Sequence, residues 1–220
     1  MGMELMLKAN KKFFIVTCII TVLPILVGLL LWNQLPDRVA THFGTDGTPN
    51  GYSSKLVAVI GIYLFCLAVH IFCALVTSVD PKGKNISPKV YRLILCICPL
   101  VSIYAGATVY GNALDYRGVN STVWINALMA VILIVVGNYL PKCRQNYTIG
   151  IKLPWTLADE ENWDYTHRMA GKWWIAGGVL SFMAAFQPWI DPVYVSLAII
   201  MIVTLIPGVA SYLYFRKHSL

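Results

Sequence analysis

The sequence predicts an all-α membrane protein with six transmembrane helices and both termini on the cytoplasmic side. It further predicts a cap formed by one outer loop and an interfacial helix in one cytoplasmic loop. Three observations support this fold class. Six long stretches lack Asp, Glu, Lys and Arg, the basic residues gather on one side of these stretches, and two connecting loops are longer than connectors need to be. A composition that is 58% hydrophobic and 12% charged excludes a soluble globular domain.

The charge-free stretches have the length of a bilayer crossing. A helix needs roughly 20 apolar residues to span the hydrocarbon core, and its backbone groups must be bonded within the segment because lipid offers no partners. The stretches are 13–36, 56–79, 93–114, 118–141, 173–190 and 192–215. The fifth is short and contains Gly177-Gly178 and Pro188, so a re-entrant segment is the alternative to a full crossing there.

The distribution of basic residues predicts the orientation. If the six stretches cross the membrane in turn, alternate connecting segments lie on the same side. Of the 17 Lys and Arg residues, fourteen then lie on the side of the N-terminus, and only Arg38, Lys55 and Arg117 lie on the opposite side. Because Lys and Arg concentrate in cytoplasmic loops, both termini are predicted to be cytoplasmic. The net charge of +7 then reflects membrane topology. Direct binding to nucleic acid would need a clustered basic face on a soluble module, and the sequence contains no such module.

Loop lengths divide the chain into two predicted units. The amino-terminal unit, 13–77, has two spans joined by the outer loop 33–55. The carboxy-terminal unit, 93–220, has four spans and the cytoplasmic loop 141–172. The segment 78–92 contains Pro and Gly punctuation and is typical of an ordinary basic turn. Function is therefore sought first in the two long loops.

The outer loop has the signals of a short extended piece followed by a compact cap. The run Val-Ala-Thr-His-Phe at 39–43, followed by two turn signals, suggests a short extended segment. Asp46-Gly47 and Asn50-Gly51 are turn signals, because Gly adopts positive φ at little cost and Asn or Asp tolerates it.

The cytoplasmic loop has the signals of a helix start. Thr156 with Asp159 resembles a capping box, which predicts a helix from Thr156 to Lys172 that continues into the fifth stretch. Glu160 and Glu161 would lie in its first turn, where the helix dipole favours negative charge.

The same predicted helix has a distinct aromatic face. Four residues fall on one side of it and are expected at the membrane interface: Trp163, His167, Ala170 and Trp174. Asp164 and Arg168 are four residues apart with the acid first, the favourable order for an ion pair on a helix.

Both loops resemble a known family. The segments Leu35-Pro36, Thr41-His42-Phe43, Gly47 and Gly51–Lys55 resemble the amino-terminal domain of unknown function in SdpI-type membrane proteins. The cytoplasmic loop is similar to the signature of the SdpI carboxy-terminal domain through Gly150–Leu157, Glu160–Trp163, Thr166–Arg168 and Gly171-Lys172. Together the two similarities cover most of the chain.

The resemblance implies a bacterial cytoplasmic-membrane protein that protects its host from a secreted, membrane-active toxin peptide. It also implies that the toxin-bound protein holds a cytoplasmic DNA-binding autorepressor at the membrane. The family supplies no catalytic residues and no cofactor, and neither an enzyme nor a metal site is expected. A membrane enzyme or a small-solute transporter of unknown substrate is the alternative, although no carboxylate lies at mid-membrane to drive a proton-coupled pump.

The candidate functional residues form three groups. Contact with the toxin or another ligand is expected in the outer loop, at His42, Phe43, Asp46, Asn50 and Tyr52. The cytoplasmic signature comprises Pro154, Trp155, Thr156, Glu160, Glu161, Trp163, His167 and Arg168.

The third group is a single residue, His70. It is the only ionisable residue among Asp, Glu, Lys, Arg and His that lies within the six charge-free stretches. Such residues within a membrane span are functional candidates by default. Cys66, His70 and Cys73 share a helical face, so a metal site remains an alternative to a hydrogen-bonded packing role. The acidic cytoplasmic loop leaves the same alternative open.

Overall fold

The structure is a computed structural model that describes residues 4–116, 121–187 and 189–218, so Arg117 and Pro188 lie outside the described residues. Helices make up most of these residues: α1 (Glu4–Ala9), α2 (Lys11–Leu30), α3 (Ile62–Ser78), α4 (Pro88–Ala113), α5 (Ser121–Tyr139), α6 (Pro154–Ala158), α7 (Glu160–Ala184) and α8 (Pro192–His218). Among the described residues, five helices are long and apolar enough to cross a membrane: Lys11–Leu30, Val57–Ser78, Pro88–Ala113, Thr122–Lys142 and Pro192–His218.

The chain forms two compact units. Unit 1 comprises Met1–Val79 and Pro88–Ser121, and unit 2 comprises Asp80–Ser87 and Thr122–Leu220. This grouping differs from the division by loop length, because α4 packs with the amino-terminal helices and the segment 80–87 packs with the carboxy-terminal ones.

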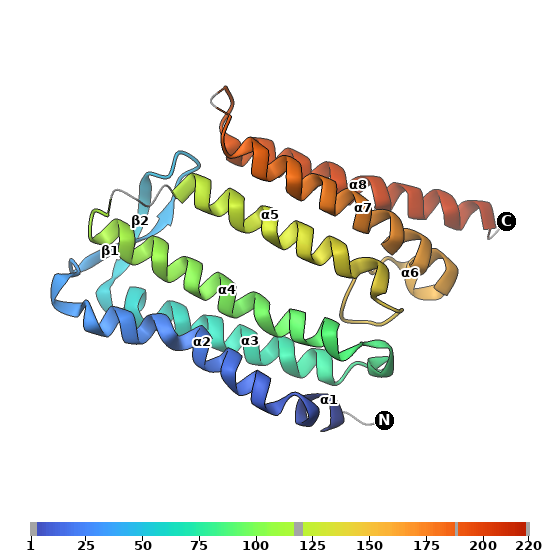
Figure 1. The fold of residues 1–220 in the computed structure, drawn as a ribbon, viewed down its shortest axis with the longest axis horizontal. Coiled ribbons are helices and arrows are strands. Elements are labelled where there is room, and N and C mark those ends of the chain that lie inside the picture. The colour runs from blue at the N-terminus through green and yellow to red at the C-terminus, as the bar shows by residue number, and fades with distance from the viewer. Residues whose placement is uncertain (1–3, 117–120, 188, 219–220) are drawn as a thin grey trace. The chain divides into compact units, whose positions relative to one another are not determined.

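In unit 1, α2, α3 and α4 lie side by side (Figure 1). Pro24 lies inside α2, and α4 approaches it closely at Gly106, where an added Cβ would lie 3.0 Å from the proline ring. Two hydroxyls of α4 donate to carbonyls of α2: Ser102 Oγ to Thr21 O at 2.6 Å, and Tyr110 Oη to Pro24 O at 2.9 Å. Such side-chain donors stabilise a proline-containing helix where lipid offers no hydrogen bonds.

A β-hairpin connects α2 to α3, so the all-α prediction is incomplete. Strands β1 (Arg38–Phe43) and β2 (Pro49–Ser54) pair antiparallel, with irregular register around His42. The extended segment 39–43 is confirmed as part of β1, whereas β2 was not predicted. The hairpin base is anchored in a buried cluster made of Leu35, Val39, Ala58, Val59, Tyr63, Val109 and Tyr110.

One of the two predicted turns in this hairpin is wrong. Asp46-Gly47 forms the turn, and Gly47 has a φ of 78°. Asn50 and Gly51 instead lie within β2. Gly51 pairs with His42, and an added Cβ would lie 2.8 Å from His42 Cβ. Close cross-strand packing, and not a turn, therefore requires glycine at this position.

In unit 2, α7 packs against both α5 and α8 through glycines. A Cβ added at Gly177 would lie 2.7 Å from Val203 of α8, and one added at Gly178 would lie 2.8 Å from the Ala130 carbonyl oxygen of α5. Figure 1 shows α7 and α8 running alongside each other for most of their length.

The fifth charge-free stretch forms only the second half of α7. This helix ends at Ala184, and its first half carries the charged residues of the cytoplasmic loop. For that reason α7 is not among the five helices that qualify as spans by length and composition.

Candidate functional site

The signature residues of the 141–172 loop converge on a buried aromatic pair. Trp163 and His167 lie one turn apart on α7, are 0% and 1% exposed, and stack with ring centroids 4.0 Å apart. Trp163 Nε1 donates a hydrogen bond of 2.7 Å to the Cys143 carbonyl. This face of the helix is therefore buried within unit 2. Its position at the membrane interface stays a prediction.

His167 joins α7 to the preceding loop as a neutral ring. Its Nδ1 lies 2.7 Å from the Trp163 carbonyl, which can only accept, so Nδ1 carries the proton. Nε2 then accepts the Ile151 N–H at 2.9 Å. Burial lowers the pKa of His167, although the hydrogen bond to Trp163 and the charge of Asp164 act in the opposite direction. Both ring nitrogens are thus committed to backbone groups.

Gly150 is required for this arrangement. Its φ of 118° is one that other residues rarely adopt. A Cβ at this position would overlap His167 Nε2 and would lie 3.0 Å from the Trp163 ring.

Two helices, α6 and α7, begin in the region where the sequence predicted one. Pro154 is the first residue of α6, and Thr156 in the same helix accepts the Leu153 N–H at 2.9 Å and donates to the Ile151 carbonyl at 2.8 Å. The chain then breaks at Asp159, whose carboxylate accepts the Glu161 N–H at 2.9 Å and caps α7. The predicted cap at Thr156 is wrong, but Glu160 and Glu161 do occupy the first turn of α7.

A second polar cluster links this region to α8. Trp155 Nε1 donates to Ser211 Oγ at 2.8 Å. Ser211 Oγ in turn donates to Asn162 Oδ1 at 2.9 Å, and Asn162 Nδ2 donates to the Ser211 carbonyl at 3.1 Å. Thr166 Oγ1 also donates to Asn162 Oδ1, at 3.0 Å. Asn162, Thr166 and Ser211 are fully buried, so this cluster fixes α8 against both α6 and α7.

Asp80 is a residue that the sequence analysis missed. Its carboxylate accepts the Tyr147 N–H at 2.8 Å, the Thr148 hydroxyl, and the Lys82 N–H at 2.7 Å. Asp80 is 8% exposed. The segment 80–87, expected to be an ordinary turn, is therefore part of the site.

Gln145 provides a second link to the same segment. Its Oε1 accepts from Lys82 Nζ, and its backbone carbonyl accepts from Asn85 Nδ2 at 2.7 Å. Its Nε2 donates to the Thr156 carbonyl at 2.9 Å and to that of Leu157 at 3.0 Å. Through Gln145, segment 80–87 is connected to α6.

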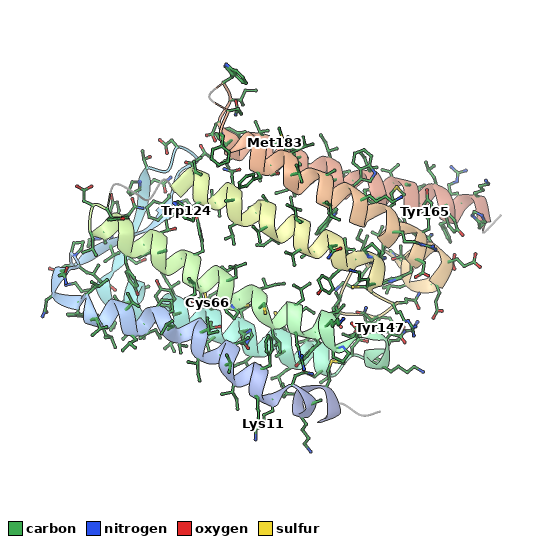
Figure 2. The ribbon with its side chains drawn as sticks, viewed as in Figure 1. Lys11, Cys66, Trp124, Tyr147, Tyr165 and Met183 are labelled. Atoms are coloured by element: carbon green, nitrogen blue, oxygen red, sulfur yellow. The ribbon has the colours of Figure 1, made fainter. Side chains whose placement is uncertain are left out.

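The acidic side chains of the site face outward. Glu160, Glu161 and Asp164 are exposed. A polar pocket of about 270 Å³ is lined by Asn85, Arg144, Gln145, Glu160 and Asp164. The expected Asp164–Arg168 ion pair is replaced by a hydrogen bond of 3.3 Å from Arg168 Nε to the Asp164 carbonyl. Tyr165, which projects from α7 in Figure 2, stacks on Tyr214 beside these acids.

The hairpin residues expected to contact a ligand are mostly accessible. His42, Asp46, Asn50 and Tyr52 are exposed, and Phe43 is half-buried. His42 Nδ1 is hydrogen-bonded to Asn50 Oδ1 across the strands. The Asp46 carboxylate accepts both the hydroxyl of Thr48, at 2.7 Å, and its N–H, at 3.0 Å, and these bonds lower the Asp46 pKa. The cap is thus cross-linked by side-chain hydrogen bonds and presents an ionised carboxylate at its tip.

His70 lies in a helix-packing contact of unit 1. It is 1% exposed, its Nε2 lies 3.0 Å from Thr17 Oγ1, and its ring stacks on Phe14. Within the residues that the structure describes, no three His, Cys, Asp or Glu side chains come together as metal ligands. Cys66, His70 and Cys73 are therefore not assembled into a metal site, and neither are the loop acids.

Known proteins share both loops with this chain. Residues 142–215 match the SdpI/YfhL protein family, and residues 19–67 match a domain of unknown function (DUF1648). The resemblance to the SdpI family is confirmed. Over 207 residues the chain is 25% identical to the immunity protein SdpI of Bacillus subtilis (strain 168), with 92% of this chain and 96% of that protein covered. No solved structure matches the chain.

The SdpI match contains most of the site. The segment 142–215 includes Gln145, the Trp163–His167 pair and Ser211 of α8, but Asp80 lies outside it. Together with five apolar helices, the similarity to SdpI identifies the chain as a multi-pass protein of the bacterial cytoplasmic membrane.

Proposed function

We propose that this chain is an SdpI-type immunity protein that protects its host from a secreted, membrane-active toxin peptide. The observation that carries the proposal is the similarity to an immunity protein along 92% of this chain and 96% of the relative. Such coverage includes the hairpin and the cytoplasmic loop as well as the spans. A role that needs only one unit would not require similarity over both.

The β-hairpin is the proposed contact surface for the toxin. Its side chains at His42, Asp46, Asn50 and Tyr52 are exposed, while its base is fixed in the buried cluster around Val39. Tyr52 is 52% exposed, and an aromatic side chain provides a large contact area at low entropic cost. A hairpin that is anchored at its base and exposed at its tip is suited to capture a peptide before it inserts.

This role requires the hairpin to face outward, which a cytoplasmic N-terminus followed by one span provides. The number of later crossings is a separate question. We propose that α7 crosses the membrane with α5 and α8, because Gly177 and Gly178 bring its apolar half into close contact with both candidate spans. Small residues at such contacts are typical of helix packing in lipid. Reporter fusions after Asn50 and after Asp159 should report opposite compartments. Fusions after Asp159 and after Asp191, which lie on either side of α7, should also report opposite compartments. The same compartment for both members of either pair would rule out this topology.

Expression of the chain in a toxin-sensitive bacterium tests protection directly. Survival should rise on exposure to peptides of the cognate type. Tyr52→Ala should reduce survival at an equal level of folded protein, because it removes the exposed aromatic contact. Tyr147→Ala is the matched control, since Tyr147 is 48% exposed but belongs to the other unit. Unchanged killing with the unmodified chain would contradict immunity and leave a membrane enzyme or a small-solute transporter as the alternative.

We also propose that the exposed acids at the start of α7 recruit a cytoplasmic DNA-binding autorepressor. A DNA-binding protein is basic, and charge complementarity steers such encounters. Replacing Glu160 and Glu161 by Gln should spare toxin resistance but weaken recruitment of the repressor to the membrane. Asp37→Asn is the control, because Asp37 is an exposed acid in unit 1. If the double variant loses resistance in step with folded protein, the loop acts structurally and the recruitment proposal fails.

A further inference from the structure

A basic pocket lies at the amino-terminal end of α2. It has a volume of about 690 Å³ and is lined by Lys8, Ala9, Asn10, Lys11, Lys12, Phe13, Val16 and Arg92. Four of these side chains are cationic, and none of the described lining residues is an Asp or Glu. All belong to unit 1. Lys11, Lys12 and Arg92 therefore concentrate positive charge around a pocket whose described lining contains no acid.

The pocket has a defined position relative to the membrane. The apolar span Lys11–Leu30 begins at a residue that lines the pocket, and Lys11 projects outward from this end of α2 in Figure 2. Below the cations, Val16 and Ile19 are 51% and 59% exposed. This places a cationic layer directly above an apolar helix face, at the depth of lipid headgroups.

Arg92 is held in place at the wall of this pocket. Its Nε donates a hydrogen bond of 2.8 Å to Asn10 Oδ1, and its guanidinium carbon lies 5.8 Å from the centre of the Phe13 ring. Asn10 is itself 4% exposed and donates to the Met6 carbonyl at 2.9 Å. The Nη groups of Arg92 make no hydrogen bond to the described residues that would compete with a ligand. A guanidinium fixed in this way is suited to bind phosphate through two donors.

We propose that this pocket binds the phosphate headgroup of an anionic phospholipid, with the acyl chains lying along the exposed face of α2. Basic pockets at the ends of transmembrane helices recognise such headgroups through charge and hydrogen bonding. The apolar track of Val16 and Ile19 favours a lipid over a soluble phosphate, because a soluble phosphate would leave this track unused. The inference is independent of the proposed immunity function.

A lipid titration of the purified full chain in neutral detergent, followed by native mass spectrometry, tests the proposal. The protein should retain phosphatidylglycerol in preference to phosphatidylcholine. Lys11→Gln/Lys12→Gln should weaken phosphatidylglycerol binding by on the order of 25-fold, since each basic residue near a membrane surface contributes about fivefold. Both lysines are exposed, so this variant is expected to fold. Arg92→Gln should weaken binding at least as much and supplies an independent second variant.

Arg216→Gln/Lys217→Gln is the matched control, because it removes the same charge from the last turn of α8, outside the pocket. It should leave phosphatidylglycerol binding unchanged. Equal retention of both lipids, or equal losses in the pocket and control variants, would overturn the proposal. An excess of glycerol 3-phosphate should not displace the lipid. Full displacement would assign the pocket to a soluble phosphate and likewise refute the lipid assignment.

Discussion

The Gly150→Ala variant tests whether the Trp163–His167 pair organises the cytoplasmic loop. Gly150 has a φ of 118°, and alanine would overlap His167 Nε2. A non-glycine residue in such a conformation costs about 1–3 kcal/mol. If residue 150 moves away from the His167 ring to relieve this overlap, the hydrogen bond from Ile151 N–H to His167 breaks. An unsatisfied buried donor costs about 1–3 kcal/mol. The two costs would add to about 2–6 kcal/mol, but effects at residues in contact are not additive. We therefore expect the free energy of unfolding to decrease by about 2–4 kcal/mol.

Thermal unfolding of the purified protein in detergent measures the global effect, which should lower the melting temperature by roughly 5–15 °C. Labelling of Cys143 by a membrane-impermeant maleimide measures the local effect. Cys143 is 7% exposed, and burial raises its pKa to about 11, so its thiol should react slowly until the loop opens. Gly208→Ala is the control, because an added Cβ there meets nothing within 4 Å. If the two variants unfold and label alike, the reasoning about this pair is refuted.

Three further variants or conditions probe other parts of unit 2. Lowering the pH below about 6.5 should reduce the free energy of unfolding by at most about 1.4 kcal/mol per pH unit until the folded-state pKa of His167 is reached. Burial lowers the folded-state pKa of His167, so its neutral ring contributes to stability above the unfolded-state pKa, and this contribution is lost as the pH falls. His167→Gln should abolish this pH dependence in melts at several pH values, and an unchanged slope would contradict the prediction. Asn162→Ala should cost about 1–3 kcal/mol in thermal denaturation, because it removes the partner of Ser211 and Thr166; a neutral effect would show that water replaces the side chain. Gly178→Ala should lower the melting temperature through its clash with the Ala130 carbonyl of α5 at a cost of about 1–3 kcal/mol, and an unchanged melt would mean that α7 does not pack this closely.

The sequence predicted those features that depend on composition over a local window. Five charge-free stretches reappear as helices long enough to cross a membrane, because an apolar run of that length has few alternatives in lipid. The acids at Glu160 and Glu161 do begin a helix, since the helix dipole acts within one turn. The extended piece at 39–43 also formed as expected.

Features that depend on long-range pairing were not predictable. Asp80 reaches Tyr147, 67 residues away in the chain, and nothing in its local sequence distinguishes it from an ordinary turn residue. Asn50-Gly51 is a typical turn sequence, but Gly51 lies in β2 because its lack of a side chain allows close packing on His42. At the start of α7 two side chains could cap, and Asp159 does so because Thr156 is already committed to the backbone of residues 151 and 153.

The placement of segment 80–87 in unit 2 has a consequence for dividing the protein. A fragment that begins at residue 122 contains the whole 142–215 family match but omits Asp80, leaving the Tyr147 N–H and the Thr148 hydroxyl without their carboxylate. The two units are therefore interleaved along the gene and are not consecutive modules. Segment 80–87 should therefore stay with the carboxy-terminal helices in fragment expression, in domain swaps between relatives and in split-protein reporters. A cut at a single point separates the loop around Tyr147 from Asp80, to which it is hydrogen-bonded.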